Sequence, residues 1–221
     1  MSDGHAAHAG HHPRLQHHFD TLEQQKEASS FGMWVFLVTE IMFFGGLFCA
    51  YLIYRSAHVQ GFAAASHELD VVLGTVNTAV LIGSSLTMAM GVWAAQTARS
   101  RAAVGFLLAT IALGCTFLGI KVVEYSTKIH HHLLPGPSFR WPGAEAAAAE
   151  QFYSLYFAMT GLHALHMIIG IAVVAALVVP AWRGRFDGAY HNPVEVTGLY
   201  WHFVDIVWIF LFPLLYLIGR H

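Results

Sequence analysis

A few ionisable residues interrupt long apolar stretches of this sequence, and their types and spacing give the first indication of chemistry. They are Glu40, Lys121, Glu124, His163, His166, Glu195, His202 and Asp205. An ionisable side chain at the centre of a membrane costs at least ~2.5 kcal/mol and is a hypothesis of function by default. The elements that carry these residues decide whether that cost applies.

Glu40 follows the start of an apolar run by about ten residues, which as helix rise about 15 Å and place the carboxyl near mid-membrane. No Lys or Arg lies within four residues of it in VTEIMFFGG. A partner on another helix, contact with water, or protonation through desolvation must therefore compensate it. Two interpretations stay open: a proton-linked carboxyl, or a structural acid that is hydrogen-bonded to a neighbour.

His163 and His166 share one helix face in TGLHALHMIIG, as do Glu195 and His202, with Asp205 one turn beyond. Imidazole and carboxylate groups can bind a metal ion or haem iron. Neither segment carries the Glu-x-x-His repeat of di-iron bundles, however. We therefore favour an interhelical hydrogen-bond network, worth about 0.6 kcal/mol per bond, and predict no metal site in this chain.

Lys121 and Glu124 are three residues apart near the end of an apolar run. That spacing predicts an ion pair along one helix, which we assign to the same structural polar network. Cys49 and Cys115 both fall inside apolar runs. They are expected to be buried small apolar residues and not a disulfide framework.

The composition indicates a protein that folds in a bilayer. Of 221 residues, 56% are hydrophobic and only 11% are charged, against about 25% charged in soluble domains. The net charge of −2 is too small to indicate a nucleic-acid partner.

Five apolar runs are long enough to span a membrane, which takes about 20 residues of helix. They cover about residues 31–54, 69–95, 102–123, 152–179 and 194–218. The sequence thus predicts an all-α, polytopic membrane protein with a five-helix bundle in residues 31–219, preceded by a His-rich cytoplasmic tail in residues 1–30. The tail contains no apolar segment typical of a cleavable signal peptide.

The orientation follows from the Lys and Arg residues near the ends of the runs. With the N-terminus inside, two short connections with two Arg each also fall inside; they hold Arg99, Arg101, Arg183 and Arg185. We therefore predict that the N-terminus is inside and the C-terminus outside.

Several segments resemble subunit III of the haem–copper terminal oxidases. They are TEIMFFGGLF, LGTVNTAVLIGSS, EY at 124–125, TGLHALHMIIG and GLYWHFVDIVWIFLF, in the order found in that family. The resemblance extends from residue 31 to about residue 218. It is closest to the five-helix bacterial members, which lack the first two helices of the longer form.

The resemblance implies a multi-pass, non-catalytic subunit of a proton-pumping respiratory oxidase in the bacterial cytoplasmic (inner) membrane. Haem and copper would reside in partner subunits and none in this chain. Subunit I would be the direct partner, with subunit II and a small subunit IV in the complex, and phospholipid would be bound. The chain would stabilise subunit I and support proton uptake, and Glu40 matches the family's carboxyl-reagent-reactive residue. Either cytochrome c or quinol could be the electron donor.

Three other functions compete with this one. A subunit III homologue of a nitric oxide reductase would share the motifs. A stand-alone transporter would be expected to show an inverted repeat with interrupted helices, and none is visible in the five runs. A membrane metalloenzyme would use the His, Asp and Glu residues as ligands.

Overall fold

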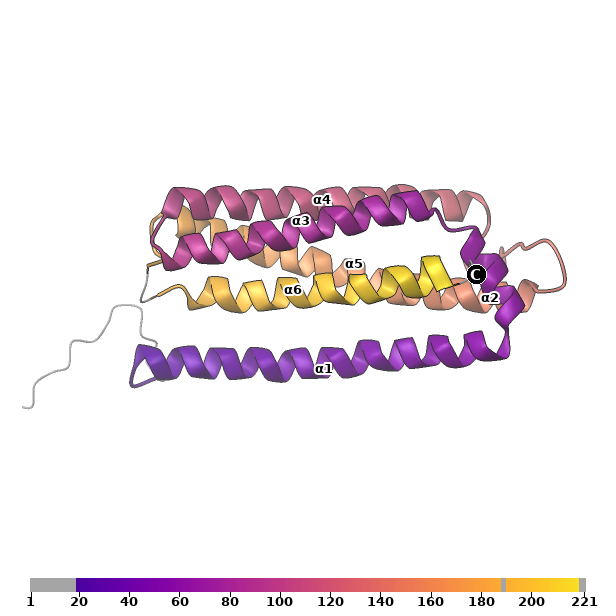
Figure 1. Cartoon of the computed structure of the whole chain (residues 1–221), viewed down its shortest axis with the longest axis horizontal. Helices are drawn as coiled ribbons and strands as arrows, with labels where there is room; N and C mark the ends of the chain where they lie inside the picture. Colours follow the sequence, from indigo (N-terminus) through magenta and orange to yellow (C-terminus); the bar gives the residue numbers. More distant parts are fainter. Residues whose placement is uncertain (1–18, 188–189, 219–221) are drawn as a thin grey trace, which may run out of the picture.

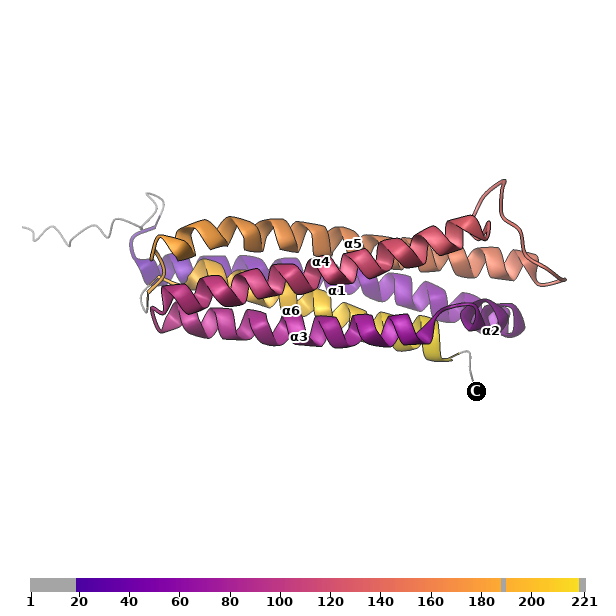
Figure 2. The ribbon, with the colours of Figure 1, turned by 90° about the horizontal axis from the view of Figure 1, so that it is seen from above.

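A computed structural model describes residues 19–187 and 190–218, which form six α-helices, one short π-helix and no strand. The α-helices are α1 (Leu22–Ala57), α2 (Val59–His67), α3 (Val71–Gln96), α4 (Ser100–His130), α5 (Ala146–Trp182) and α6 (Asn192–Phe212), and the π-helix η1 is Pro213–Leu217. The long helices run side by side along one axis (Figures 1 and 2). The predicted all-α class is confirmed.

Five stretches of the described chain are long and apolar enough to cross a membrane: α1, α3, α4, α5, and α6 continued into η1. They correspond in order to the five predicted spans, so the five-span architecture is also confirmed. Helices α1, α4 and α5 extend several residues beyond the predicted apolar runs, and the last span changes from α-helix to π-helix at Pro213. The residues that flank or interrupt the runs explain these differences.

Helix α1 begins at Leu22, within the segment that was expected to be tail. Thr21 caps the helix by accepting a hydrogen bond from the Gln24 backbone N–H at 3.1 Å. The Gln24 side chain in turn accepts from the Asp20 backbone N–H at 2.8 Å. This reciprocal pattern is a variant of the capping box and starts a helix in polar sequence. The part of the tail before residue 19 lies outside the described residues.

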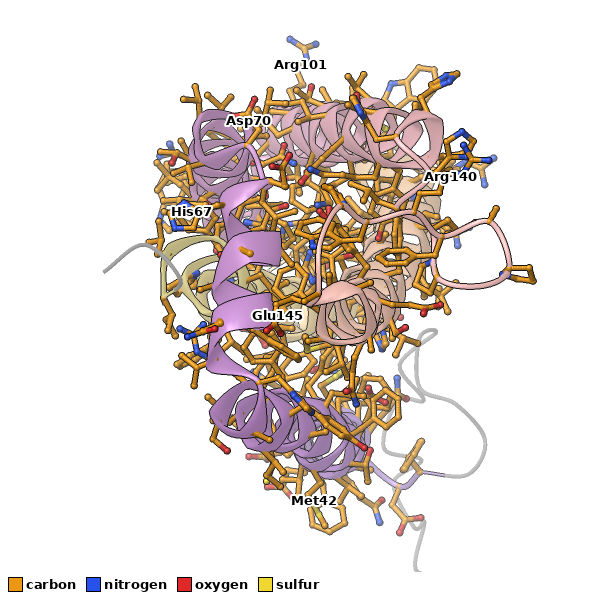
Figure 3. All side chains as sticks on the ribbon, turned by 90° about the vertical axis from the view of Figure 1, so that its right-hand side faces the viewer. Met42, His67, Asp70, Arg101, Arg140 and Glu145 are labelled. Atoms are coloured by element: carbon orange, nitrogen blue, oxygen red, sulfur yellow. The ribbon has the colours of Figure 1, made fainter. Side chains whose placement is uncertain are left out.

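Helix α2 was not predicted and lies across one end of the bundle, beside Glu145 at the start of α5 (Figure 3). It buries Phe62, Ala65 and Ser66, and the Ser66 hydroxyl donates to the Leu215 carbonyl at 2.8 Å. A nine-residue helix is too short to give a membrane-spanning signal. At this end of the bundle α2 is followed by Asp70, which caps α3 by accepting from the Val72 and Leu73 backbone N–H groups.

Helix α6 is the most enclosed span and α1 the most open. Of the most apolar window of each, 56% of the residues are buried for α6–η1 and 17% for α1. Trp201 and Trp208 of α6 are fully buried. Helix α1 lies along one edge of the bundle (Figure 1), and Met42 projects away from it (Figure 3). Helix α1 therefore has a large surface that can face lipid or a partner.

The fifth span changes its hydrogen-bond register at Pro213. This residue has no backbone N–H, and the Ile218 N–H donates to the Pro213 carbonyl in the wider π pattern. The turn brings Tyr216 into the bundle, where it is fully buried.

The expectation that both cysteines are buried was wrong. Cys49 and Cys115 are free and exposed on their helices. In a membrane protein an apolar run does not indicate burial in protein, because lipid is as apolar as the core.

Candidate functional site

Glu40 on α1 pairs with His166 on α5, so this contact between an acid and an imidazole joins two helices. The Glu40 Oε2 to His166 Nε2 distance is 3.2 Å. The other ring nitrogen of His166 lies 2.8 Å from the Leu162 carbonyl oxygen. A carbonyl can only accept, so this nitrogen carries a proton. The 3.2 Å separation can accommodate one further proton between Nε2 and the carboxyl, in a neutral pair or in an ion pair.

The Glu40–His166 pair is held by aromatic neighbours. Phe44 packs edge-on against the His166 ring with centroids 5.5 Å apart. Tyr200 of α6 stacks on the same ring at 6.5 Å and donates its hydroxyl to the His166 carbonyl at 2.9 Å. The two polar side chains remain 19% and 14% exposed, so the pair is near the surface of the chain and not deep in its core.

Lys121 and Glu124 form the predicted i,i+3 ion pair, at 2.9 Å, with both side chains almost fully buried. Two tyrosines complete the group: Tyr156 and Tyr216 donate their hydroxyls to Glu124 Oε1 at 2.9 and 2.6 Å. The Lys121 ammonium donates to the same two hydroxyl oxygens at 3.2 and 3.0 Å. Both charges are thereby paired and hydrogen-bonded, which is the condition for burying them.

The Lys121 ammonium also lies within cation–π range of four aromatic rings. The distances to the centroids of Trp208, Tyr156, Tyr125 and Tyr216 are 5.0, 5.2, 5.5 and 5.7 Å. Three helical segments, α4, α5 and α6–η1, therefore converge on this cation. Sequence reasoning missed Tyr156 and Tyr216, although a tyrosine hydroxyl inside an apolar span needs a partner and is a usable signal.

His163 has no hydrogen-bond partner for either ring nitrogen among the described residues, although it is fully buried. Its ring lies between Phe117 and Trp208, with centroid distances of 5.3 and 5.2 Å. Thus His163 and His166, three residues apart, have different environments: one is enclosed by aromatic rings and the other faces Glu40.

His202 and Asp205 do not reach His163 or His166. The His202 Nδ1 lies 2.6 Å from the Ser85 hydroxyl oxygen on α3. Asp205 is only 3% exposed, and neither carboxyl oxygen has a hydrogen-bond partner in the part of the chain that is described.

Glu195 belongs to a separate polar group near the start of α6. Gln96 of α3 donates to its Oε1 at 2.5 Å. His191 lies 3.2 Å from the same oxygen, and Lys26 of α1 lies 3.5 Å from Oε2. These contacts join the ends of three helices.

The structure thus distributes the predicted polar residues over separate groups and does not join them into one network. Within residues 19–187 and 190–218, no three His, Cys, Asp or Glu side chains are grouped so that they could hold a metal ion. Ser85 and Gln96 belong to the polar groups of His202 and Glu195, respectively. They could not be predicted from the sequence, because only the packing of α3 on α6 brings them to these partners.

Fold and site together define the class: a multi-pass, all-α membrane protein whose intramembrane ionisable groups are paired, Lys121 with Glu124 along α4 and Glu40 with His166 across two helices. The sequence profile of the family described as Cytochrome c oxidase subunit III matches residues 15–220. The chain therefore belongs to the family of subunit III of the haem–copper oxidases, and it is a component of an oxidase complex of the electron transport chain.

Relatives in this family are named for both kinds of electron donor. A cytochrome c oxidase subunit 3 of Thermostichus vulcanus is 36% identical over 193 residues, which are 86% of this chain and 87% of that protein. A cytochrome bo(3) ubiquinol oxidase subunit 3 of Pseudomonas aeruginosa is 29% identical over 192 residues, 86% and 84% of the two chains. A cytochrome c oxidase subunit 3 of Alkalihalophilus pseudofirmus is 31% identical over 189 residues, 85% of each.

Proposed function

We propose that this chain is a non-catalytic subunit III of a proton-pumping respiratory oxidase in a bacterial cytoplasmic membrane. It carries no redox centre, packs against subunit I in a complex with subunit II and a small subunit IV, stabilises subunit I and supports proton uptake. Haem and copper reside in the partner subunits. The observation that carries the proposal is the family match along residues 15–220, which includes the whole membrane bundle.

The Glu40–His166 pair supports the role in proton uptake. The 3.2 Å contact between the carboxyl and Nε2 allows a proton to pass from one group to the other without any movement of the helices. Both side chains are partly exposed, so the pair is open to a partner subunit that covers this face of the chain. A carboxyl and an imidazole that share a proton are suited to accept and release protons near a partner's uptake pathway.

Bound phospholipid is supported by a groove between α1 and α6. Its volume is about 480 Å³, and its lining is almost wholly apolar and includes Trp34, Ile41, Phe48 and Phe210. The dimensions and the apolar lining suit an acyl chain.

The first test of the proposal is the identity of the purified complex. Affinity purification of the chain from its native membrane is expected to yield a subunit I with two haems and copper. A non-haem-iron reductase in its place would contradict the oxidase assignment and support the nitric oxide reductase alternative.

The proton-linked role is tested with Glu40→Gln in the purified oxidase. The amide retains a hydrogen-bonding group near His166 but cannot exchange a proton. The initial rate of O2 reduction is expected to stay near that of the wild type, while sustained turnover or proton uptake falls several-fold. Met42→Leu, two residues away on the exposed face of α1, is the matched control. Unchanged steady-state activity and proton stoichiometry in Glu40→Gln would rule out the role.

A further inference from the structure

Asp205 is buried without a hydrogen-bond partner, which is costly anywhere and most costly in a membrane. It is 3% exposed, and both carboxyl oxygens lack a partner among the described residues. The Ser85 hydroxyl is close enough to interact with this carboxyl, but its geometry is poor for a hydrogen bond to Asp205, and its short contact is with the His202 Nδ1 at 2.6 Å. The described chain therefore offers Asp205 at most the single hydroxyl proton of Ser85, which cannot satisfy both carboxyl oxygens.

The carboxyl lines a cavity of about 300 Å³ between α3 and α6. The polar lining consists of Ser85, His202 and Asp205, and the apolar lining includes Ile82, Ile206 and Ile209. These isoleucines are 56%, 51% and 46% exposed, respectively. The cavity thus combines a polar interior with an apolar surface that faces outward from the bundle.

The depth of the cavity restricts what can fill it. Asp205 lies about halfway along the Asn192–Leu217 span, and Ser85 about halfway along α3. A lipid at this depth presents only its acyl chain, which cannot donate a hydrogen bond. Water alone would have to remain beside exposed isoleucines in hydrocarbon. A transmembrane helix satisfies both requirements, because it brings an apolar flank together with a polar side chain.

We infer that the cavity formed by Ser85, His202 and Asp205 is the docking site for a transmembrane helix of a partner subunit. The partner helix packs on Ile82, Ile206 and Ile209 and inserts a hydrogen-bond donor, either a hydroxyl, an amide or a cationic group, that bonds to Asp205. The inference rests on the proposed function in one respect, that the chain acts as a subunit of a larger membrane complex. It adds the face and the chemistry of the contact.

Asp205→Leu separates this inference from a role inside the chain. The melting temperature of the purified full chain in detergent is expected to stay unchanged or to rise, because no well-formed hydrogen bond within the described chain is lost. In the complex, the ratio of this chain to haem after detergent washing is expected to fall several-fold. Asp205→Asn, which can still accept a hydrogen bond, is the control and is expected to retain most of the chain. A lowered melting temperature of the isolated Asp205→Leu chain, or unchanged retention in the complex, would overturn the inference.

A photocrosslinking residue at Ile209 identifies what covers the cavity. In the purified complex it is expected to crosslink to a protein subunit, and the same variant as an isolated chain is expected to give no protein adduct. Adducts with lipid only, in the complex, would refute the docking site. A crosslink to a subunit of some complex other than an oxidase would keep the docking site and reject the proposed function.

Discussion

The structure shows two different ways of placing an ionisable group inside a membrane protein: the Glu40–His166 pair and the Lys121–Glu124 pair. In the first, an acid near the chain surface is paired with an imidazole. In the second, Lys121 and Glu124 are fully paired deep in the bundle and are held by Tyr156 and Tyr216. The first arrangement is a partly exposed acid–imidazole contact, whereas the second fixes every donor and acceptor. Of the two, only the first therefore fits the proposed role in proton uptake.

The paired state of Lys121 and Glu124 predicts how stability responds to substitution. Lys121→Met or Glu124→Gln alone leaves an uncompensated buried charge and is expected to cost about 3–5 kcal/mol. The double variant removes both charges and is expected to recover most of that loss. Thermal unfolding of the four proteins in one detergent measures the coupling. Additive losses in the double variant would show that the two side chains act independently.

Residues close in sequence were predicted better than residues paired across helices. The Lys121–Glu124 contact follows from three-residue spacing on one helix and is present. The partner of Glu40 could not be chosen from the sequence, because the choice of His166 over His163 depends on the rotation of α5 towards α1. Asp205 shows the same limit, since the spacing of polar residues on α6 does not reveal which neighbouring helix faces them.

At the scale of elements, apolar run length predicted the spans but not their ends. The ends are set by local polar groups: the Thr21 cap for α1, the Asp70 cap for α3 and the missing N–H of Pro213 for the change from α6 to η1. Membrane hydropathy carries no information on such groups. Helix α2 was missed for the same reason, because it lies across the end of the bundle and is held by packing on α5 (Figure 3).

Close approach of α5 and α6 depends on Gly170. A Cβ at this position would lie 3.1 Å from Trp201 and 3.2 Å from Tyr200, and both rings have little room to move. Gly170→Val is therefore expected to destabilise the chain by about 1–3 kcal/mol through overpacking. At Gly119 of α4 an added Cβ would meet nothing within 4 Å. Gly119→Val is thus the control for the effect of valine in a helix.

The measurement for this glycine pair is the melting temperature of each purified chain in the same detergent. A larger loss for Gly170→Val than for Gly119→Val is the expected result. Equal decreases in melting temperature would mean that α5 and α6 can move apart without loss of stability, and that Trp201 does not fix the distance between them.

At the scale of the whole molecule, the bundle has two different ends. The α3–α4 turn and the α5–α6 connection lie at the end where α1 begins, whereas α2 and the 131–145 connection lie at the other end (Figures 1 and 2). Arg99, Arg101, Arg183 and Arg185 are therefore gathered at the first end. A concentration of Arg in short connections is typical of the cytoplasmic side.

This asymmetry predicts that the first end faces the cytoplasm and the second end the outside. Single cysteines introduced at Arg101 and Arg140, in a background with Cys49 and Cys115 replaced by Ala, probe the two ends. Arg140→Cys is expected to react with a membrane-impermeant thiol reagent in intact spheroplasts. Arg101→Cys is expected to react only after permeabilisation, because the reagent cannot cross the membrane to reach the cytoplasmic end of the bundle. The reverse pattern would place the start of α1 and the Glu195 group on the outside and would overturn the predicted orientation.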